Sequence, residues 1–253
     1  MCNEYQIPTK WEEYEAMMRH VDLGIVGARP ELPTDPDIRI GDAAPVIRMA
    51  GNGVELVPMR FGFPPPRPKA APVFNFRSEG RHFEGSNRCL IPATGFYEFT
   101  GSKYPKTKHR FWRPDQPWLV IAGLWRSTNA GEAFTMLTTE PGPDIAPIHD
   151  RQVVVLEPRQ WMEWLALGRP EAELLRPSPE GTLGTEVVRT GAQFPDAIRE
   201  RQVDGVAGSR QCPDRDDERS GNATSGNPCA PAGLPVGPWS SWIPHARRRL
   251  GRA

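Results

Sequence analysis

The sequence contains no apolar run close to the roughly 20 residues that a helix needs to span a bilayer. Its first fifteen residues also lack both the basic and the apolar segment of a secretory signal. We therefore expect a cytoplasmic protein without a membrane partner. Cysteine is scarce as well, and the chain has no C-x2-C pair among its four (Cys2, Cys89, Cys212 and Cys229). In a reducing compartment these residues are expected to stay free thiols, and no metal or cofactor site is predicted.

Net charge is absent too, because 31 basic residues balance 31 acidic ones. Any nucleic-acid contact would therefore need a local cationic surface. Glycine (24) and proline (29) stay below the share that is typical of disordered chains. With 38% hydrophobic residues and eight tryptophans, the chain can build a hydrophobic core. Collagen, coiled coils and fully disordered chains are excluded.

Short apolar or alternating runs, rich in β-branched and aromatic residues, dominate the first 190 residues and predict strands of a mostly antiparallel sheet. These runs cover residues 54–59, 88–98, 118–125, 134–138 and 153–157. Two helices are predicted, over residues 10–20 and 158–167; in the second, Pro158 can occupy the first helical position. The predicted class is α+β, with a single domain over residues 1–190.

Residues 191–253 lack lysine altogether and are rich in glycine and proline. Such a composition cannot bury enough apolar surface to offset the entropy of ordering, so we predict a disordered tail. The tail ends in WSSWIPHARRRLGRA, which combines tryptophans with a basic run. This peptide suits binding to nucleic acid or another partner, or it is simply solvated.

Cys2 follows the initiator methionine directly, and its small size favours removal of Met1. The new N-terminus would then carry an amine and a thiol on adjacent carbons. The amine pKa lies near 7.7–8.0, so an appreciable fraction of it is a neutral nucleophile at pH 7. Such a 1,2-aminothiol condenses with aldehydes, or acts as an N-terminal nucleophile towards amides. Alternatively, Cys2 is an ordinary small residue.

Two side chains are candidates for proton transfer. His149 lies in a predicted loop just before a strand, where imidazole can act as a general acid or base. Glu98 is flanked by aromatic residues in GFYEF, so desolvation would raise its pKa. The alternatives are a surface histidine and an outward-facing strand residue.

Asn75 and Arg77 alternate with phenylalanines in VFNFRSE, so on a strand they share one face. An amide beside a guanidinium suits binding of a sugar or a phosphate. The same alternation is also ordinary strand patterning.

Together, four motifs resemble the SRAP family, the SOS response-associated peptidases or abasic-site processing proteins. The motifs are Met1-Cys2, N-x-R-x-E at 75–79, R-C-L-I-P-A-x-G-F-Y-E at 88–98 and A-P-I-H-D-R at 146–151. The resemblance extends to about residue 190. It implies a single α+β domain built on a strongly curved antiparallel sheet, with a groove for single-stranded DNA.

The resemblance also implies a role for each site residue. Cys2, as the new N-terminus, captures the ring-opened aldehyde of an abasic site as a thiazolidine, and Asn75 positions the sugar and the amine. Arg77 holds a flanking phosphate, and Glu98 works on the sugar hydroxyl and the proton transfers of imine formation. His149 assists ring opening and crosslink reversal. Thr138 lies where the family often has a hydrogen-bonding partner.

The chain departs from the family pattern at two places. Glu4 stands where the family commonly has an arginine that binds phosphate, so that DNA contact is not expected here. The family usually has W-G-(L/I)-(I/V)-P where this chain has Arg60-Phe61-Gly62-Phe63-Pro64. Phe61 is expected to stack on a base as a smaller aromatic wedge, in a stiffer loop.

The resemblance thus implies a monomeric, peptidase-like enzyme or lyase that binds abasic sites in single-stranded DNA, from a family associated with DNA damage and the SOS response. Two other functions stay open at this point. The protein could be an N-terminal-nucleophile hydrolase of small amides or peptides, which would need an oxyanion hole. It could also be a non-catalytic DNA-binding module in which Cys2 is incidental.

Overall fold

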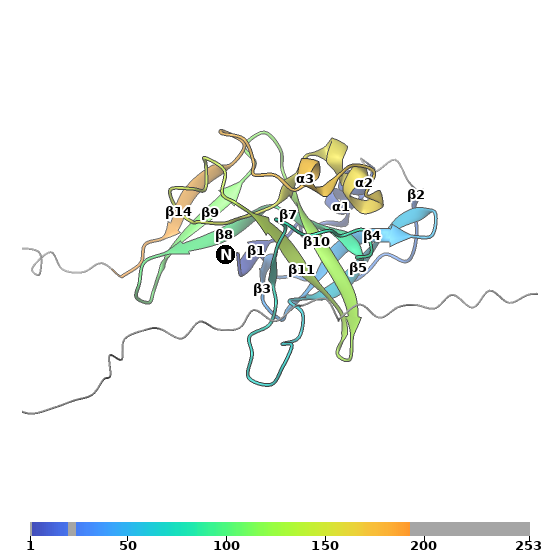
Figure 1. Cartoon of the computed structure of the whole chain (residues 1–253), viewed down its shortest axis with the longest axis horizontal. Helices are drawn as coiled ribbons and strands as arrows, with labels where there is room; N and C mark the ends of the chain where they lie inside the picture. Colours follow the sequence, from blue (N-terminus) through green and yellow to red (C-terminus); the bar gives the residue numbers. More distant parts are fainter. Residues whose placement is uncertain (1, 20–23, 193–253) are drawn as a thin grey trace, which may run out of the picture. The chain divides into compact units, whose positions relative to one another are not determined.

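The computed structural model describes residues 2–19 and 24–192, which form fourteen strands and three helices (Figure 1). The helices are α1 (Trp11–Met18), α2 (Pro158–Ala166) and α3 (Glu171–Leu174). The strands are β1 (Glu4–Gln6), β2 (Gly24–Ile25), β3 (Asp37–Arg39), β4 (Ala43–Ala50), β5 (Gly53–Phe61), β6 (Asn75–Arg77), β7 (Arg88–Ala93), β8 (Gly95–Thr100), β9 (Thr107–Trp112), β10 (Leu119–Thr128), β11 (Gly131–Thr139), β12 (Gln152–Val153), β13 (Val155–Leu156) and β14 (Gly184–Arg189). Strands dominate and helices are few, as predicted.

The strands form two sheets, and most of their pairings are antiparallel. One sheet has the order β14-β9-β8-β1-β3, and the larger one runs β12-β11-β10-β7-β4-β5-β2, with β6 and β13 paired at its side. A parallel pairing between β11 and β5, with Phe134 opposite Phe61, closes the strands β5, β4, β7, β10 and β11 into a ring. The larger sheet is therefore curved into a barrel-like ring.

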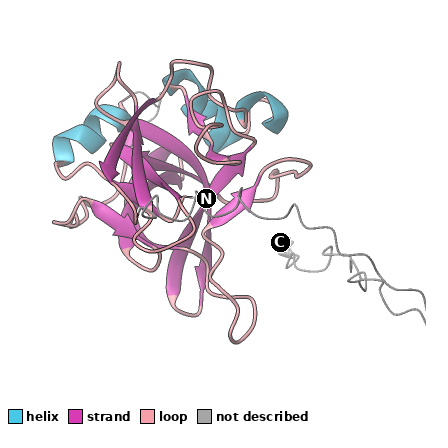
Figure 2. Ribbon diagram, turned by 90° about the vertical axis from the view of Figure 1, so that its left-hand side faces the viewer, coloured by secondary structure: helices cyan, strands magenta, loops and turns pink. Residues whose placement is uncertain are grey.

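Both faces of β7, of the first six residues of β10 and of most of β11 are buried, which explains the nearly continuous apolar runs there in the sequence. On β10, Val120 and Ala122 pack towards the helices, whereas Leu119 and Ile121 belong to a second core that includes the small sheet. All three helices contribute side chains to the first core. Figure 2 shows the helices, in cyan, beside the magenta strands. No helix within the described ranges is long and apolar enough to cross a membrane.

Helix α2 begins at Pro158, as predicted, and buries Trp161, Trp164 and Leu165. The Trp164 indole donates a hydrogen bond to the carbonyl of Cys89 over 3.1 Å, which fixes the helix against β7. Because a buried indole N–H needs an acceptor, this bond accompanies the burial of the ring. The first helix is shorter than predicted and covers Trp11–Met18.

One prediction needs correction, because the apolar run 88–98 is two strands rather than one. The chain breaks at Thr94, whose N–H donates to the carbonyl of Gln6, and β7 and β8 then join different sheets. Gly95 leaves room for this change, since a Cβ there would lie 2.9 Å from the carbonyl oxygen of Phe111. The single sheet of the prediction is accordingly a pair of sheets.

The predicted tail lies outside the described residues, apart from its first two positions. There, Gly191 donates to the Thr107 hydroxyl and the N–H of Ala192 to the carbonyl of Pro105, over 2.9 and 2.8 Å. These bonds attach residues 191 and 192 to the start of β9. Residues 191 and 192 therefore belong to the described part of the fold.

Candidate active site

Cys2 lies two residues before the start of β1, which is inserted between β3 and β8. Its side chain is buried, with 1% of its surface exposed, and the thiol donates to the carbonyl of Glu4 over 3.3 Å. Burial raises the pKa of the Cys2 thiol well above its ordinary value. The thiol is therefore held in its neutral form.

Glu98, on β8, lies beside the N-terminal segment. The antiparallel register that places Tyr5 opposite Phe96 brings the residues before β1 alongside Glu98. The Glu98 carboxyl is 1% exposed, and burial raises its pKa to about 7. Near neutral pH the group is divided between its acid and its carboxylate form, which suits proton transfer in both directions.

His149 ends a tightly turned segment that enters the site from β11. Its N–H donates to the carbonyl of Ile145 over 2.9 Å, and the segment begins at Gly142, which packs against the main chain near Ser178. A Cβ at Gly142 would lie 2.2 Å from the Ser178 carbonyl oxygen, so only glycine fits there. The His149 Nε2 lies 3.7 Å from Glu98 Oε2. Burial lowers the His149 pKa, which favours neutral imidazole.

Asn75 links the site to the large sheet, because β6 pairs in parallel with β11. Its Nδ2 donates to the carbonyl oxygen of Cys2 over 2.8 Å. Its Oδ1 is buried and finds no hydrogen-bond donor in the part of the chain that the structure describes. Asn75 therefore holds the Cys2 main chain and keeps one acceptor available beside it.

Arg77 is the next residue on the same face of β6 and is exposed. Within residues 2–19 and 24–192, its guanidinium has no ion-pair partner closer than 4.0 Å. The register places it opposite Thr138 on β11. A free guanidinium at the rim of the site is available to bind a phosphate.

The structure does not support a direct DNA contact for Phe61 or Thr138. The Phe61 ring is fully buried and stacks on Phe134 with the centroids 5.2 Å apart, because β5 and β11 close the ring there. Thr138 is 1% exposed, and its hydroxyl accepts a hydrogen bond from Arg151 over 3.1 Å. Both residues therefore support the site from within the fold.

Sequence reasoning assigned no role to Glu79 or Arg151, although both end a quoted motif. The structure brings them together: Arg151 Nη2 donates to Glu79 Oε2 over 2.8 Å, and Nη1 donates to the other carboxylate oxygen. Their positions at the ends of N-x-R-x-E and A-P-I-H-D-R were the signal that could have identified them.

Glu4, the departure noted in the sequence, is nearly buried and engages two cations. Lys108 Nζ lies 2.9 Å and Arg39 Nη2 3.3 Å from its Oε1. Two cations and one carboxylate leave this cluster with a single positive charge. Glu4 is thus neutralised within the fold and does not present a free anion beside Cys2.

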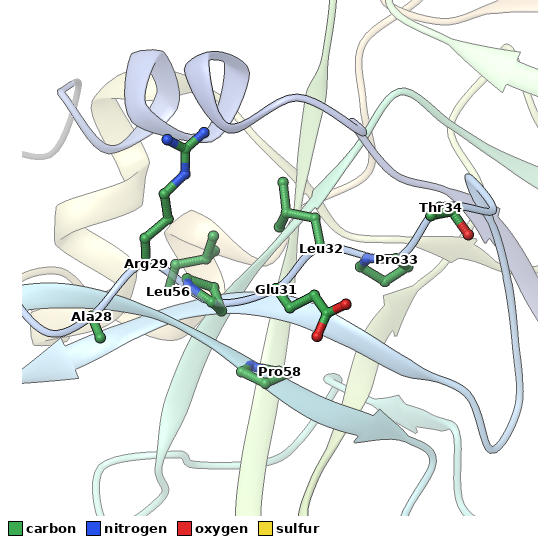
Figure 3. Close-up of a pocket in the computed structure, with 9 residues that line it drawn as sticks. Ala28, Arg29, Glu31, Leu32, Pro33, Thr34, Leu56 and Pro58 are labelled. Atoms are coloured by element: carbon green, nitrogen blue, oxygen red, sulfur yellow. The ribbon is translucent and has the colours of Figure 1, made fainter.

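A shallow pocket of about 740 Å³ lies elsewhere, between the loop 28–34 and β5 (Figure 3). Leu56 and Pro58 supply its side on β5, and none of the predicted site residues lines it. No group of three or more potential metal ligands occurs among the described residues. The candidate active site is therefore the cluster around Cys2, Asn75, Glu98 and His149.

Comparisons with known proteins point to one family. The model of the SOS response associated peptidase (SRAP) family matches residues 1–192. The chain is 30% identical over 185 residues to the abasic site processing protein YobE of Bacillus subtilis (strain 168), covering 65% of this chain and 82% of YobE. The chain is also 30% identical to the abasic site processing protein YoqW of Bacillus phage SPbeta, over 65% of this chain and 80% of YoqW.

Solved structures show the same fold. A protein from Bordetella bronchiseptica superposes with a TM-score of 0.58 at 27% identity, covering 74% of this chain and all of that one. A protein from Bacteroides thetaiotaomicron superposes with a TM-score of 0.56 at 18% identity, over 74% of this chain and 92% of the other. The second likeness concerns the fold alone.

Proposed function

Because this chain belongs to the SOS response associated peptidase (SRAP) family, we propose that it processes abasic sites in single-stranded DNA through a covalent bond to Cys2. One observation carries the proposal. A buried cysteine at the second position is held by Asn75 and lies beside a carboxyl group that is itself 3.7 Å from a histidine. An N-terminal cysteine placed beside a general acid and a general base has the groups that thiazolidine formation needs.

The first event is hydrolysis of the Met1–Cys2 peptide bond, which consumes one water and leaves Cys2 with a free amine. We infer that this removal of Met1 is the peptidase-like activity of the protein. The freed amine belongs to the residue whose carbonyl Asn75 holds, and the Asn75 Oδ1, which finds no donor among the described residues, can accept an amine N–H. That bond would direct the nitrogen lone pair towards the bound sugar.

Capture of the abasic sugar then proceeds in two bond-forming steps. The Cys2 amine attacks C1′ of the open-chain aldehyde, and Glu98 in its acid form protonates the departing hydroxyl and takes back the remaining N–H proton, so that water leaves and an imine remains. The Cys2 sulfur then adds to the same carbon while the thiol proton passes to the nitrogen, by way of Glu98. The product is a thiazolidine, and one water is released overall.

The perturbed protonation of the site residues fits this order of steps. Because burial keeps the Cys2 thiol neutral, the amine rather than the sulfur is the first nucleophile. Because the Glu98 pKa is about 7, a large share of this carboxyl can donate a proton near neutrality. Neutral His149 can assist ring opening through its Nε2, which lies 3.7 Å from Glu98 Oε2. Glu98 in its acid form protonates the ring oxygen that leaves C1′ and takes the proton of the C1′ hydroxyl on its other oxygen, and the same exchange runs backwards when the crosslink reverses.

Two features of the site support single-stranded DNA as the partner. Arg77 is an exposed guanidinium suited to a phosphate next to the abasic nucleotide. The buried position of Cys2 requires the sugar to enter the site away from a base stack, which single-stranded DNA permits at lower cost than a duplex. We propose that a monomer carries all the residues of this site.

A denaturing gel after incubation with an oligonucleotide that contains an abasic site tests the function. We expect a heat-stable shifted band for the unmodified protein and none for Cys2→Ala; Cys2→Ser should form at most a weak adduct. Cys89→Ala is the matched control, because Cys89 is a second buried cysteine whose loss should leave the band. A normal band with Cys2→Ala would overturn the proposal, and cleavage of small amides without any band would favour the hydrolase instead.

A further inference from the structure

Arg151 ties together three segments around the candidate active site. Its guanidinium binds both carboxylate oxygens of Glu79, which follows β6, and also donates to the carbonyl oxygen and the hydroxyl of Thr138 at the end of β11. The Arg151 side chain is only 11% exposed, whereas that of Glu79 is 44% exposed. A bidentate pair of this kind fixes the direction of the guanidinium as well as its distance.

The main chain of Arg151 acts on His149. The Arg151 N–H donates a hydrogen bond to His149 Nδ1 over 3.0 Å. A ring nitrogen that accepts a hydrogen bond carries no proton, so neutral His149 must carry its proton on Nε2. Nε2 is the nitrogen that lies 3.7 Å from Glu98 Oε2. The amide of Arg151 therefore selects the tautomer that directs an N–H towards the Glu98 carboxyl.

A competing partner shows why this amide must be held in place. Asp150 Oδ1 lies 2.9 Å from the same Nδ1, but the Asp150 side chain is 86% exposed. A carboxylate can only accept, so a bond to Asp150 needs a proton on Nδ1 and excludes the bond from Arg151. The two partners thus favour opposite protonation of Nδ1, and the fixed position of Arg151 favours the Nε2–H form.

We propose that Glu79 is a positioning residue of the active site, which holds Arg151 so that its backbone amide fixes the tautomer and the ring orientation of His149. The effect of Glu79 passes through two contacts, the Glu79–Arg151 pair and the Arg151–His149 hydrogen bond. Glu79 itself touches neither the cysteine nor the carboxyl at the centre of the site. A role for Glu79 in the reaction rests on the proposed function, whereas its effect on His149 is present without bound DNA.

The direct test is the ¹⁵N spectrum of labelled histidine, in which protonated and unprotonated ring nitrogens are well separated. In the unmodified protein at neutral pH, we expect His149 almost entirely as the Nε2–H tautomer. In Glu79→Ala, the ratio of Nε2–H to Nδ1–H should fall about tenfold, as expected when one hydrogen bond is lost. Glu79→Asp, which keeps the charge, should recover part of this ratio.

A second ion pair of the chain supplies the control. Arg48 Nη1 lies 2.7 Å from Glu132 Oε1 in a pair that contacts none of the site residues. Glu132→Gln should leave the His149 tautomer ratio unchanged. An unchanged ratio in Glu79→Ala, or an equal fall in Glu132→Gln, would overturn the proposal. If Glu79→Ala does not fold, Arg151→Lys keeps the charge but loses the bidentate geometry, and the same fall is expected.

Crosslinking kinetics complete the test and keep the two proposals distinguishable. If the proposed function holds, Glu79→Ala should slow release of captured DNA in the same direction as His149→Ala, and Glu79→Asp should restore part of the rate. If no variant forms a crosslink, the proposed function fails, while the tautomer ratio still decides whether Glu79 positions His149. If Glu79→Ala shifts the tautomer ratio but releases captured DNA at the unmodified rate, Glu79 positions His149 without contributing to crosslink reversal.

Discussion

The side-chain amide of Asn75 donates a hydrogen bond to the carbonyl oxygen of Cys2 over 2.8 Å. This bond joins β6, at the side of the large sheet, to the segment that leads into β1 of the small sheet. The proposed nucleophile is thus positioned by a residue from a different sheet. Its main chain is fixed before any substrate binds.

Replacing Asn75 should impair formation of the crosslink more than the fold. Asn75→Ala removes both the donor to Cys2 and the free Oδ1, and Asn75→Asp removes the donor alone. We expect both variants to form adduct up to about 10²-fold more slowly, since loss of positioning costs on that order. The measurement is a time course of adduct formation, with Asn129→Ala in the exposed β10–β11 turn as the control. An unchanged rate would mean that Asn75 does not position Cys2.

Glu98 should make the stability of the protein fall as the pH rises. Its pKa is raised from 4.5 to about 7 in the folded state, so its contribution is fully present below pH 4.5 and is lost as the pH approaches 7. The loss amounts to about 3 kcal/mol. Glu98→Gln should therefore gain up to that much unfolding free energy over the unmodified protein between pH 4 and pH 8.

Chemical denaturation at the two pH values measures this difference. Glu180→Gln, at an exposed position, is the control and should show little change between them. If Glu98→Gln shows no more change than this control, Glu98 is not held as a buried acid.

His149→Ala should slow release of DNA more than capture. General acid–base groups contribute roughly 10²–10⁴-fold, whereas an aminothiol and an aldehyde already react without them. The measurement is a chase of preformed adduct with excess abasic competitor, and the exposed His82→Ala serves as the control. Release at the unmodified rate from His149→Ala would remove this histidine from reversal, although the family assignment would stand.

Arg77 should determine part of the salt dependence of the initial, non-covalent binding. Each phosphate neutralised on a single strand contributes about −0.7 to the slope of log affinity against log salt. Arg77→Ala should make the slope shallower by about that amount. Arg169, just before α3, pairs with Glu173 in that helix, so Arg169→Ala is the control and should leave the slope unchanged. Equal slopes for Arg77→Ala and the unmodified protein would exclude a phosphate contact.

Truncation should reveal where the functional domain ends. A chain that ends after Ala192 keeps β14 and the two hydrogen bonds to the start of β9, so it should crosslink normally. A chain that ends after Leu183 loses β14 and should expose the edge of β9, which favours aggregation. Solubility and crosslinking of the two fragments test the boundary, and inactivity of the longer one would contradict it.

The alternation and apolar content of the sequence were enough to predict a sheet-dominated fold with few helices. They could not predict that the run 88–98 serves two sheets, because both of its halves are apolar and only the bond from Thr94 to Gln6 marks the break. Closure of the ring through β5 and β11 was equally hidden, since parallel pairing joins residues far apart in the sequence. Phe61 therefore looked available for a base although it completes the core.

Individual site residues were recognisable in the sequence because their motifs occur in a fixed order, but their contacts were not. Nothing in the spacing of Asn75 indicates that its amide would reach the carbonyl of Cys2. The pairing of Glu79 with Arg151 was likewise invisible, since charge pairs carry no periodic signal over such separations. The chemistry of a residue type can be read from the sequence, whereas its neighbours depend on the tertiary fold.

Insertion of β1 between β3 and β8 has a consequence for the newborn chain. Cys2 and β1 are translated well before residues 95–100, which form the strand that pairs with β1 on one side. His149 follows later still. Throughout that interval the N-terminal residues have no completed sheet around them, and the candidate active site is not yet assembled. If the protein's own site removes Met1, as proposed, that removal can begin only after His149 has been translated.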